Sequence, residues 1–434
     1  MADYVASVSE PVVDDERWLT PGVRGIGAAS LLSDLGHEIP TSLLPSLLTS
    51  TLGAPASALG LIEGISDGAA GIARFAGGAL ADDPHRRRAT AVGGYASTAV
   101  FTAATGGATS ALQVGLLRTA GWTARGLRGP ARNALLADVV APTRYGAAYG
   151  FERMMDNLGA IGGPLLAIGL VSTVGIRGAI GLSVIPGLLA VLAIMYAIRH
   201  TPAPTVRERR PIRIQVRPVV QGPLRRLFVG IGAFEAGNVA ATLLILRATE
   251  QLEPGRSDTR ATTIALGLYA GYNTAATIIS IPAGRLVDRF GARHVLIAGV
   301  AAFAIAYVGF AFDTTDWWLL AIWFVLAGIG IGCVETAEHS AVATHAPEHI
   351  RGSAFGLLAA VQSFGNLAAS SIAGILWAAI SPTAAFAYIA TWMILALIAL
   401  AVHGPPSQPA TGQVAPKQPT ALGDLANDVP GRVV

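Results

Sequence analysis

Nine acidic side chains interrupt the long apolar stretches of this 434-residue chain, and several are spaced so that they could act together. Residues three or four positions apart share one face of a helix. Carboxyl groups gathered in an apolar setting can exchange protons near neutral pH, because burial disfavours their charged form. We therefore treat these acids as candidates for proton transfer: Asp34, Glu38, Glu63, Asp67, Glu152, Asp156, Glu235, Glu335 and Glu338.

Two of these groups contain a histidine at helical spacing: Asp34, His37 and Glu38 in one, and Glu335, Glu338 and His339 in the other. Carboxylate and imidazole groups suit divalent metals such as zinc or manganese, and a histidine can equally pass on a proton. We expect Asp34, with Glu38 nearby, to carry a proton that Arg118 helps to release, since a neighbouring arginine stabilises a carboxylate. The rival carriers are Glu63, Asp67 and Asp156.

The segments that would carry these side chains are apolar and long enough to cross a membrane. Of all residues, 52% are hydrophobic and only 13% are charged, whereas a soluble domain carries about 25% charged residues. One span needs about 20 apolar residues. We predict an all-α membrane protein with twelve spans, at residues 22–48, 56–80, 89–107, 110–136, 147–172, 177–198, 226–249, 261–284, 293–312, 316–344, 352–380 and 382–403.

The sequence does not indicate other kinds of chemistry. It contains no nucleotide-binding lysine loop, so ATP is not the expected energy source. Its single cysteine, Cys333, cannot form an internal disulfide. We therefore expect no cofactor and no enzyme activity.

The arginines are distributed unevenly among the connections between spans. If the N-terminus is cytoplasmic, most of them fall in inner connections, including Arg128, Arg132 and the basic stretch 199–225. Inner loops of membrane proteins carry such an excess. We therefore predict an inner (plasma) membrane protein with both termini cytoplasmic, whose basic charge faces the lipid bilayer rather than nucleic acid.

The two halves of the sequence resemble each other at a constant offset: Asp82 is matched by Asp288, and Gly150 by Gly356. Two related six-helix halves are a known plan for transporters, with the substrate site between them. The expected domains are an N-terminal segment (1–21), a first bundle (22–198), a linker (199–225), a second bundle (226–403) and a disordered tail (404–434).

The loop after the second span resembles a motif of the major facilitator superfamily, and a second copy follows the eighth span. The matching residues are Gly78, Leu80, Asp82, Arg86 and Arg87 in the first copy and Gly284, Leu286, Asp288, Arg289, Gly291 and Arg293 in the second. The first copy departs from the family at Asp83 and His85. We expect the two aspartates to form charge-assisted hydrogen bonds with nearby arginines and to close a cytoplasmic gate.

The fifth span resembles the proton-coupled exporters of this superfamily through Gly150, Gly159, Gly163 and Pro164, although Ala167 and Ile168 stand where the family continues with glycines. Residues 117–138 are similar to a bacterial subgroup suspected of exporting drugs. In that resemblance Arg118 takes the place of a fourth-helix arginine.

The resemblance implies a facilitator fold of two pseudo-symmetric bundles that works by alternating access. We predict a monomer that exports a small organic compound in exchange for protons. The alternatives are a divalent-metal transporter, a proton-coupled importer and, from another class, a membrane enzyme or sensor. The expected substrate cavity contains His37, Glu235, Asn238, Tyr272, Asn273, Glu335, Glu338 and His339.

Overall fold

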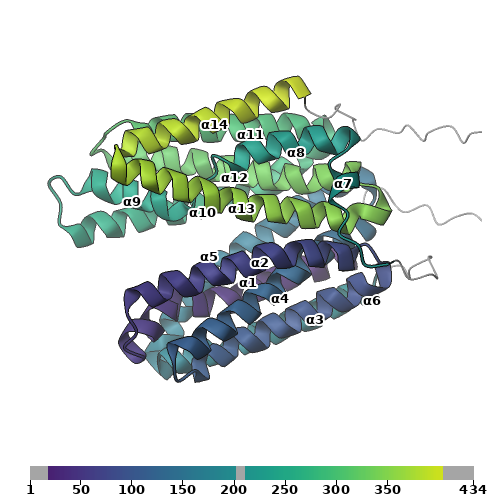
Figure 1. The fold of residues 1–434 in the computed structure, drawn as a ribbon, viewed down its shortest axis with the longest axis horizontal. Helices are drawn as coiled ribbons and strands as arrows, with labels where there is room; N and C mark the ends of the chain where they lie inside the picture. The colour runs from purple at the N-terminus through teal and green to yellow at the C-terminus, as the bar shows by residue number, and fades with distance from the viewer. Residues whose placement is uncertain (1–17, 202–210, 404–434) are drawn as a thin grey trace, which may run out of the picture.

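The computed structural model describes residues 18–201 and 211–403, and it is helical with no strand in these ranges (Figure 1). The predictions for the N-terminal segment and the tail lie almost wholly outside the described residues. The helices are α1 (Pro21–Ser46), α2 (Ala56–Ala81), α3 (Pro84–Ala104), α4 (Ala111–Asp138), α5 (Tyr145–Leu182), α6 (Val184–Arg199), α7 (Val216–Val219), α8 (Gly222–Glu235), α9 (Ala241–Leu252), α10 (Asp258–Phe290), α11 (Ala292–Ala311), α12 (Trp317–His345), α13 (Arg351–Ala379) and α14 (Pro382–His403).

The helices form two bundles, α1 to α6 and α8 to α14, which lie as two lobes in Figure 1. The all-α prediction is confirmed. One predicted span, 226–249, is divided into α8 and α9 by a non-helical stretch at residues 236–240. Backbone groups of this break are bound by other helices: Asn366 of α13 donates to the carbonyl oxygen of Asn238, and Tyr388 of α14 donates to that of Ala236.

Six stretches of the described residues are long and apolar enough to cross a membrane by composition alone, and one of them, Pro142–Arg199, covers both α5 and α6. Helices α1 to α4 fall outside this group. In α4 the reason is four arginines within its 28 residues.

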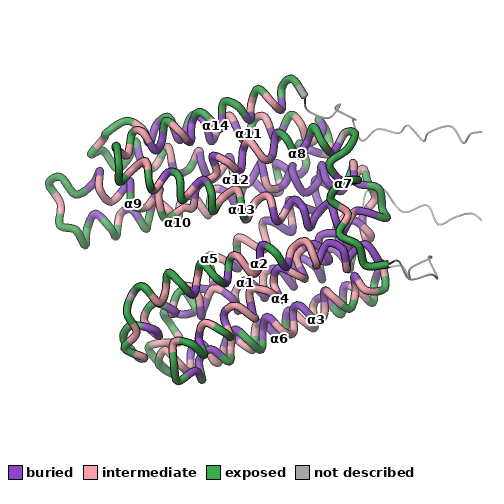
Figure 2. Tube along the Cα trace, in the orientation of Figure 1, coloured by how far each residue is buried: buried purple, intermediate pink, exposed green. Residues whose placement is uncertain are grey.

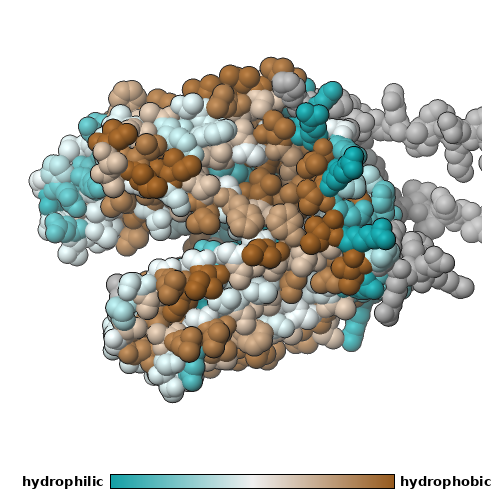
Figure 3. All heavy atoms as spheres, viewed as in Figure 1, coloured by the Kyte–Doolittle hydropathy of each residue, from teal (hydrophilic) through white to brown (hydrophobic). Residues whose placement is uncertain are grey.

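The two bundles meet at one end and separate at the other. We call the end that carries α7 the linker end, and the opposite end, with the connections 47–55 and 253–257, the far end. Figure 3 shows a wedge-shaped cleft that opens at the far end and narrows toward the linker end. Figure 2 shows many buried residues where the bundles meet near the linker end.

Glycines permit the close approach of the bundles at the linker end. A Cβ atom at Gly284 of α10 would lie 2.3 Å from the carbonyl oxygen of Gly146 in α5, and one at Gly78 of α2 would lie 2.8 Å from the carbonyl oxygen of Gly352 in α13. Contacts this short leave no room for a side chain. The repeated glycines of the sequence thus mark two equivalent crossings between the halves.

Candidate functional site

Helix α4 presents a row of arginines to the middle of the first bundle. Arg118, Arg125 and Arg132 are seven residues apart, which is close to two helical turns, so they share one face. The expectation that Arg128 and Arg132 lie in an inner loop was wrong: α4 continues to Asp138, and Arg128 is only 3% exposed. The guanidinium of Arg128 lies 3.9 Å from the centre of the Tyr95 ring.

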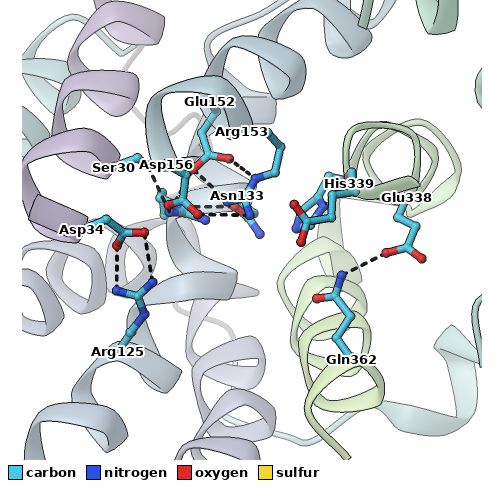
Figure 4. A network of polar contacts seen from close by, with 12 residues as sticks. Ser30, Asp34, Arg125, Asn133, Glu152, Arg153, Asp156, Glu338, His339 and Gln362 are labelled. Atoms are coloured by element: carbon cyan, nitrogen blue, oxygen red, sulfur yellow. Dashed lines mark hydrogen bonds and ion pairs between the residues drawn. The ribbon is translucent and has the colours of Figure 1, made fainter. Parts of the chain in front are cut away.

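Asp34 of α1 is bound by Arg125 through two hydrogen bonds, 2.7 Å from Nη1 to Oδ1 and 3.2 Å from Nη2 to Oδ2 (Figure 4). Asp34 is 4% exposed. The predicted partner, Arg118, instead donates to Glu63 Oε1 at 3.0 Å and to Thr41 Oγ1 at 3.0 Å. Arg118 lies two turns before Arg125 in α4, a separation of about 10 Å along the helix axis. The seven-residue spacing of the arginines was the signal that would have drawn attention to Arg125.

A second ion-pair network joins α1, α4 and α5 beside this pair (Figure 4). Arg132 Nη1 lies 2.9 Å from Glu152 Oε1 and 3.3 Å from Asp156 Oδ1. Arg153 Nε lies 2.7 Å from Glu152 Oε2, and its Nη1 lies 3.3 Å from Asp156 Oδ2. Ser30 donates to Glu152 Oε1 at 2.7 Å. Each acid therefore contacts two arginines, an arrangement that favours the ionised carboxylates.

Two of the candidate acids of the first bundle have no ion pair within the described ranges: Glu38 and Asp67. Glu38 is half-buried and lies against α5. A Cβ atom added at Gly163 of α5 would lie 2.3 Å from the Cβ of Glu38. Asp67 of α2 is exposed. Both remain able to take up a proton without first breaking an ion pair.

The acids of the second bundle are held by amides rather than by arginines. Glu338 is fully buried; its Oε2 accepts from Gln362 Nε2 at 2.9 Å (Figure 4), and its Oε1 accepts from none of the described residues. Asn238 Nδ2 donates to Glu235 Oε2 at 3.0 Å. Among the described residues neither glutamate forms an ion pair, so the charge of the second bundle is compensated less completely than that of the first.

The two histidines do not join the acids beside them in metal-binding groups. His339 Nδ1 lies 2.7 Å from the carbonyl oxygen of Glu335, and its ring lies 5.9 Å from the ring of Tyr149 between centroids. His37 packs edge-on against Trp122 at 4.8 Å within the first bundle. Within the part of the chain that the structure describes, no three histidine, cysteine or acidic side chains converge on one point. The geometry therefore gives the divalent-metal alternative no support.

The remaining cavity candidates lie on α10. Tyr272 stacks on Tyr269 with ring centroids 5.7 Å apart, and Asn273 Nδ2 donates to the carbonyl oxygen of Tyr269 at 3.2 Å. Both Tyr272 and Asn273 are half-buried. They are thus held in place from within their own helix.

The two loop-motif aspartates bridge the halves at the linker end. Asp288 accepts from the backbone nitrogens of Gly146 at 2.6 Å and Ala147 at 2.9 Å, at the start of α5. Asp82 accepts from the backbone nitrogen of Ser353 at 2.9 Å, at the start of α13, and from its hydroxyl. Burial raises the pKa of Asp82, and the hydrogen bonds from Ser353 oppose that rise.

Each aspartate therefore caps a helix N-terminus of the opposite bundle, where free N–H groups and the helix dipole favour a negative charge. Arginine partners were predicted for both, but the groups that bind these aspartates across the junction belong to the first residues of α5 and α13. Backbone donors of this kind cannot be identified from side-chain motifs, because every residue except proline has one.

The motif arginines mostly contact groups within their own halves. Arg87 binds Asp138 and donates from Nε to the carbonyl oxygen of Ala81 at 2.7 Å, and Arg86 lies 3.8 Å from Asp83. Arg293 donates to the carbonyl oxygen of Leu400 at 3.1 Å, and Arg289 lies over Phe290. These contacts hold the loop ends of each bundle in place.

The glycines of α5 let this helix cross two neighbours closely. A Cβ at Gly159 would lie 2.6 Å from the carbonyl oxygen of Leu31 in α1, and one at Gly150 would lie 2.3 Å from that of Ser280 in α10. Pro164 lies inside α5, one residue after Gly163. The predicted fifth-span motif is therefore where α5 packs against α1, directly beside Asp34 and Glu38.

Comparison with known proteins agrees with this architecture. The family model described as Major Facilitator Superfamily matches residues 26–270 and 228–430. An uncharacterized MFS-type transporter of Methanocaldococcus jannaschii is 29% identical over 86% of this chain and 93% of its own. The multidrug resistance protein MdtG of Dickeya zeae is 25% identical over 62% of this chain and 65% of its own.

Solved structures share the fold at low sequence identity. A bacterial homologue of the iron transporter ferroportin, in an outward-facing state, has a TM-score of 0.72 at 16% identity, over 88% of this chain and 98% of its own. The proton:xylose symporter XylE has a TM-score of 0.65 at 14% identity, over 88% and 95%. With its two six-helix halves and the central cleft, the chain belongs to the major facilitator superfamily and is a secondary transporter of the membrane, not an enzyme.

Proposed function

We propose that this transporter exports a small organic compound in exchange for protons. The observation that carries the proposal is the bidentate ion pair between α1 and α4, in which the buried Asp34 accepts two hydrogen bonds from the half-buried Arg125. A carboxylate in such a pair is ionised, and its protonation removes half of the pair. The proton thus has a large effect on the packing of the first bundle.

Protonation of Asp34 would leave the half-buried Arg125 guanidinium without its main partner, which is unfavourable. Asp156 and Glu38 are the other acids that interact electrostatically with Arg125. We therefore propose that Arg125 moves toward these acids when Asp34 binds a proton, and returns when the proton leaves. Because α1 contacts α5 at Gly159, this movement would reach the α5 helix and its contact with α10.

The proposed direction is export. It is supported by the glycine spacing of α5 and by the relative named as a multidrug resistance protein. We propose that the linker end lies in the cytoplasm and the chain in the inner membrane, on the basis of the arginine distribution, and that the protein acts as a monomer. In this orientation the cleft of Figure 3 faces outward. Substrate would enter between the amide-bound acids of the second bundle, Glu235 and Glu338, and the ion pairs of the first.

Inside-out vesicles with an imposed pH gradient test this proposal. A panel of small drugs, including ethidium, is added to vesicles loaded with a proton gradient, and a pH-sensitive dye reports proton release that depends on each compound. At least one compound should dissipate the proton gradient when the protein is present, and the vesicles should accumulate that compound. Asp34→Asn should abolish accumulation while downhill exchange persists, because the site loses its proton but keeps its shape.

Two substitutions separate the ion pair from a general charge effect. Arg125→Lys keeps the charge but cannot make the bidentate contact with Asp34, so it should slow gradient-driven transport about ten-fold or more. Glu253→Gln, at an exposed acid of the far end, is the matched control and should have no effect. Full accumulation by the Asp34→Asn variant would show that the proton travels elsewhere. Accumulation in the direction of the proton flux would replace export by import.

A further inference from the structure

A small cavity lies inside the first bundle, beside the turn of α1 that follows Asp34. It is lined by His37, Pro40 and Leu44 of α1, Thr102 of α3, Thr105, and Arg118 and Trp122 of α4. About 10 Å³ of it is open to the centre of a water-sized particle, which is room for about one such particle. No part of the proposed transport mechanism uses this cavity.

Four nitrogen atoms of the cavity wall are buried and have no hydrogen-bond partner among the residues that the structure describes: Nδ1 and Nε2 of His37, Nε of Arg118 and Nε1 of Trp122. His37 is 4% exposed and Arg118 is 6% exposed. Arginine and indole N–H groups can only donate, and a buried donor without an acceptor typically costs about 1–3 kcal/mol. So many unpaired donors around one small space indicate that an acceptor normally occupies it.

Arginines lie around the cavity, and two of them, Arg118 and Arg125, also bind the carboxylates of Glu63 and Asp34. The charged groups that act most strongly on the His37 ring are Arg125, Arg118 and Arg128, all of them arginines. Trp122 lies between two guanidinium groups, that of Arg118 at 5.2 Å and that of Arg125 at 5.8 Å from its ring centroid. Both guanidinium groups attract electrons from the indole and make its N–H a stronger donor.

We infer that the cavity binds one monatomic anion, chloride, through the N–H groups of Arg118, Trp122 and His37. A chloride ion accepts several hydrogen bonds at once and has none to donate, which suits a wall whose arginine and indole groups only donate. A water molecule would fit the space but would gain less from the surrounding positive charge.

The bound chloride would be structural, because it joins α1, α3 and α4 inside one bundle. Arg118 would then be shared between the ion on its Nε and Glu63 on its Nη2. The inference does not depend on the direction of transport or on the substrate. It fails or succeeds separately from the proposed proton exchange.

Thermal unfolding of the full-length protein in detergent tests the inference. Sodium chloride or bromide replaces sodium gluconate step by step at constant ionic strength, so that only the anion changes. The melting temperature should rise and level off with chloride and with bromide. If the melting temperature does not rise, or rises in proportion to the salt without levelling off, the cavity holds water only, and the inference is overturned.

Substitutions assign the effect to the cavity. Trp122→Phe removes one N–H donor but keeps an aromatic ring against His37, and it should remove most of the chloride-dependent shift. Trp377→Phe, in the second bundle, is the matched control and should keep the shift in full. If Trp122→Phe does not fold, Thr102→Val changes the cavity wall with less disturbance and should also weaken the shift.

Bromide quenching of tryptophan fluorescence gives a second measurement. In the unmodified protein a component that saturates at the same bromide concentration as the thermal shift should appear, because the ion would touch Trp122. This component should persist in Trp377→Phe and disappear in Trp122→Phe. A saturable thermal shift that survives Trp122→Phe would place the anion elsewhere and would contradict the assignment.

Discussion

The Asp288 carboxylate lies 2.6 Å from the backbone nitrogen of Gly146, across the junction between the two halves of the protein. Asp82 makes the equivalent contact with Ser353 on the other side of the pseudo-symmetric junction. Both aspartates thus act on helix starts that belong to the opposite bundle. A gate built from two helix caps behaves differently from one built from ion pairs, and substitutions can distinguish the two.

If the gate consists of helix caps, the Asp288→Ala and Asp288→Asn variants should differ in how much of the protein is closed at the linker end. Removal of a capping side chain typically costs about 1 kcal/mol, which is about a five-fold change in the population of the closed state. An asparagine amide could still accept one of the two hydrogen bonds, so Asp288→Asn should have a smaller effect than Asp288→Ala. Distances between spin labels placed on the two bundles at the linker end measure the closed population.

The Asp82→Ala, Asp288→Ala double variant should combine both losses and leave the linker end mostly open. Asp316→Ala, at an exposed cap within the second bundle, provides the control, because it also removes a capping carboxylate but not one between the halves. A closed population that is equal in the double variant and the unmodified protein would contradict the gate.

Glu152→Ala should be strongly destabilising. Glu152 is fully buried and contacts both Arg132 and Arg153, so its loss leaves Asp156 as the one acid paired with these two guanidinium groups among the described residues. Breaking a buried pair in this way typically costs about 3–5 kcal/mol. Asp313→Ala is the matched control: it also breaks an arginine pair, with Arg247, but Asp313 is 86% exposed, and such pairs contribute about 0–1 kcal/mol. Melting temperatures of the two purified variants test the difference, and similar melting temperatures would show that the central network contributes little.

Gly163→Ala should impair transport, whereas Gly169→Ala should not. A Cβ at Gly163 would lie 2.3 Å from the Cβ of Glu38, while a Cβ at Gly169 in the same helix meets nothing within 4 Å. The first change forces α1 and α5 apart next to Asp34, and overpacking of this kind typically costs about 1–3 kcal/mol. Transport rates at equal protein amounts in vesicles provide the measurement. Equal rates for the two variants would mean that the α1–α5 contact is not needed for transport.

The orientation in the membrane can be tested with single cysteines. After Cys333→Ser, a cysteine is introduced at Ser257 on the far end or at Gln215 near the linker end. With the linker end in the cytoplasm, an impermeant thiol reagent applied to intact cells should label the first cysteine and not the second. The opposite labelling pattern would reverse the topology, and with it the outward orientation of the cleft.

The sequence by itself determined the fold class and the positions of the helices. Composition, hydrophobic length and the repeated loop motifs were enough, because a chain with so few charges must bury its helices in lipid and satisfy the backbone within them. The sequence also identified Asp34, Glu152, Glu235 and Glu338 as unusual, since an acid inside an apolar stretch is costly wherever it lies.

The pairing of these charges was decided only by the tertiary structure. Asp34 could have met any arginine of α4, and only the relative height and rotation of α1 and α4 selected Arg125 over Arg118. A shift of one helix by two turns would exchange these partners without any change in sequence pattern. The contacts of Asp82 and Asp288 depended on tertiary structure for another reason: their partners are backbone N–H groups, which nearly every residue carries and which only the packing of the two halves brings into reach.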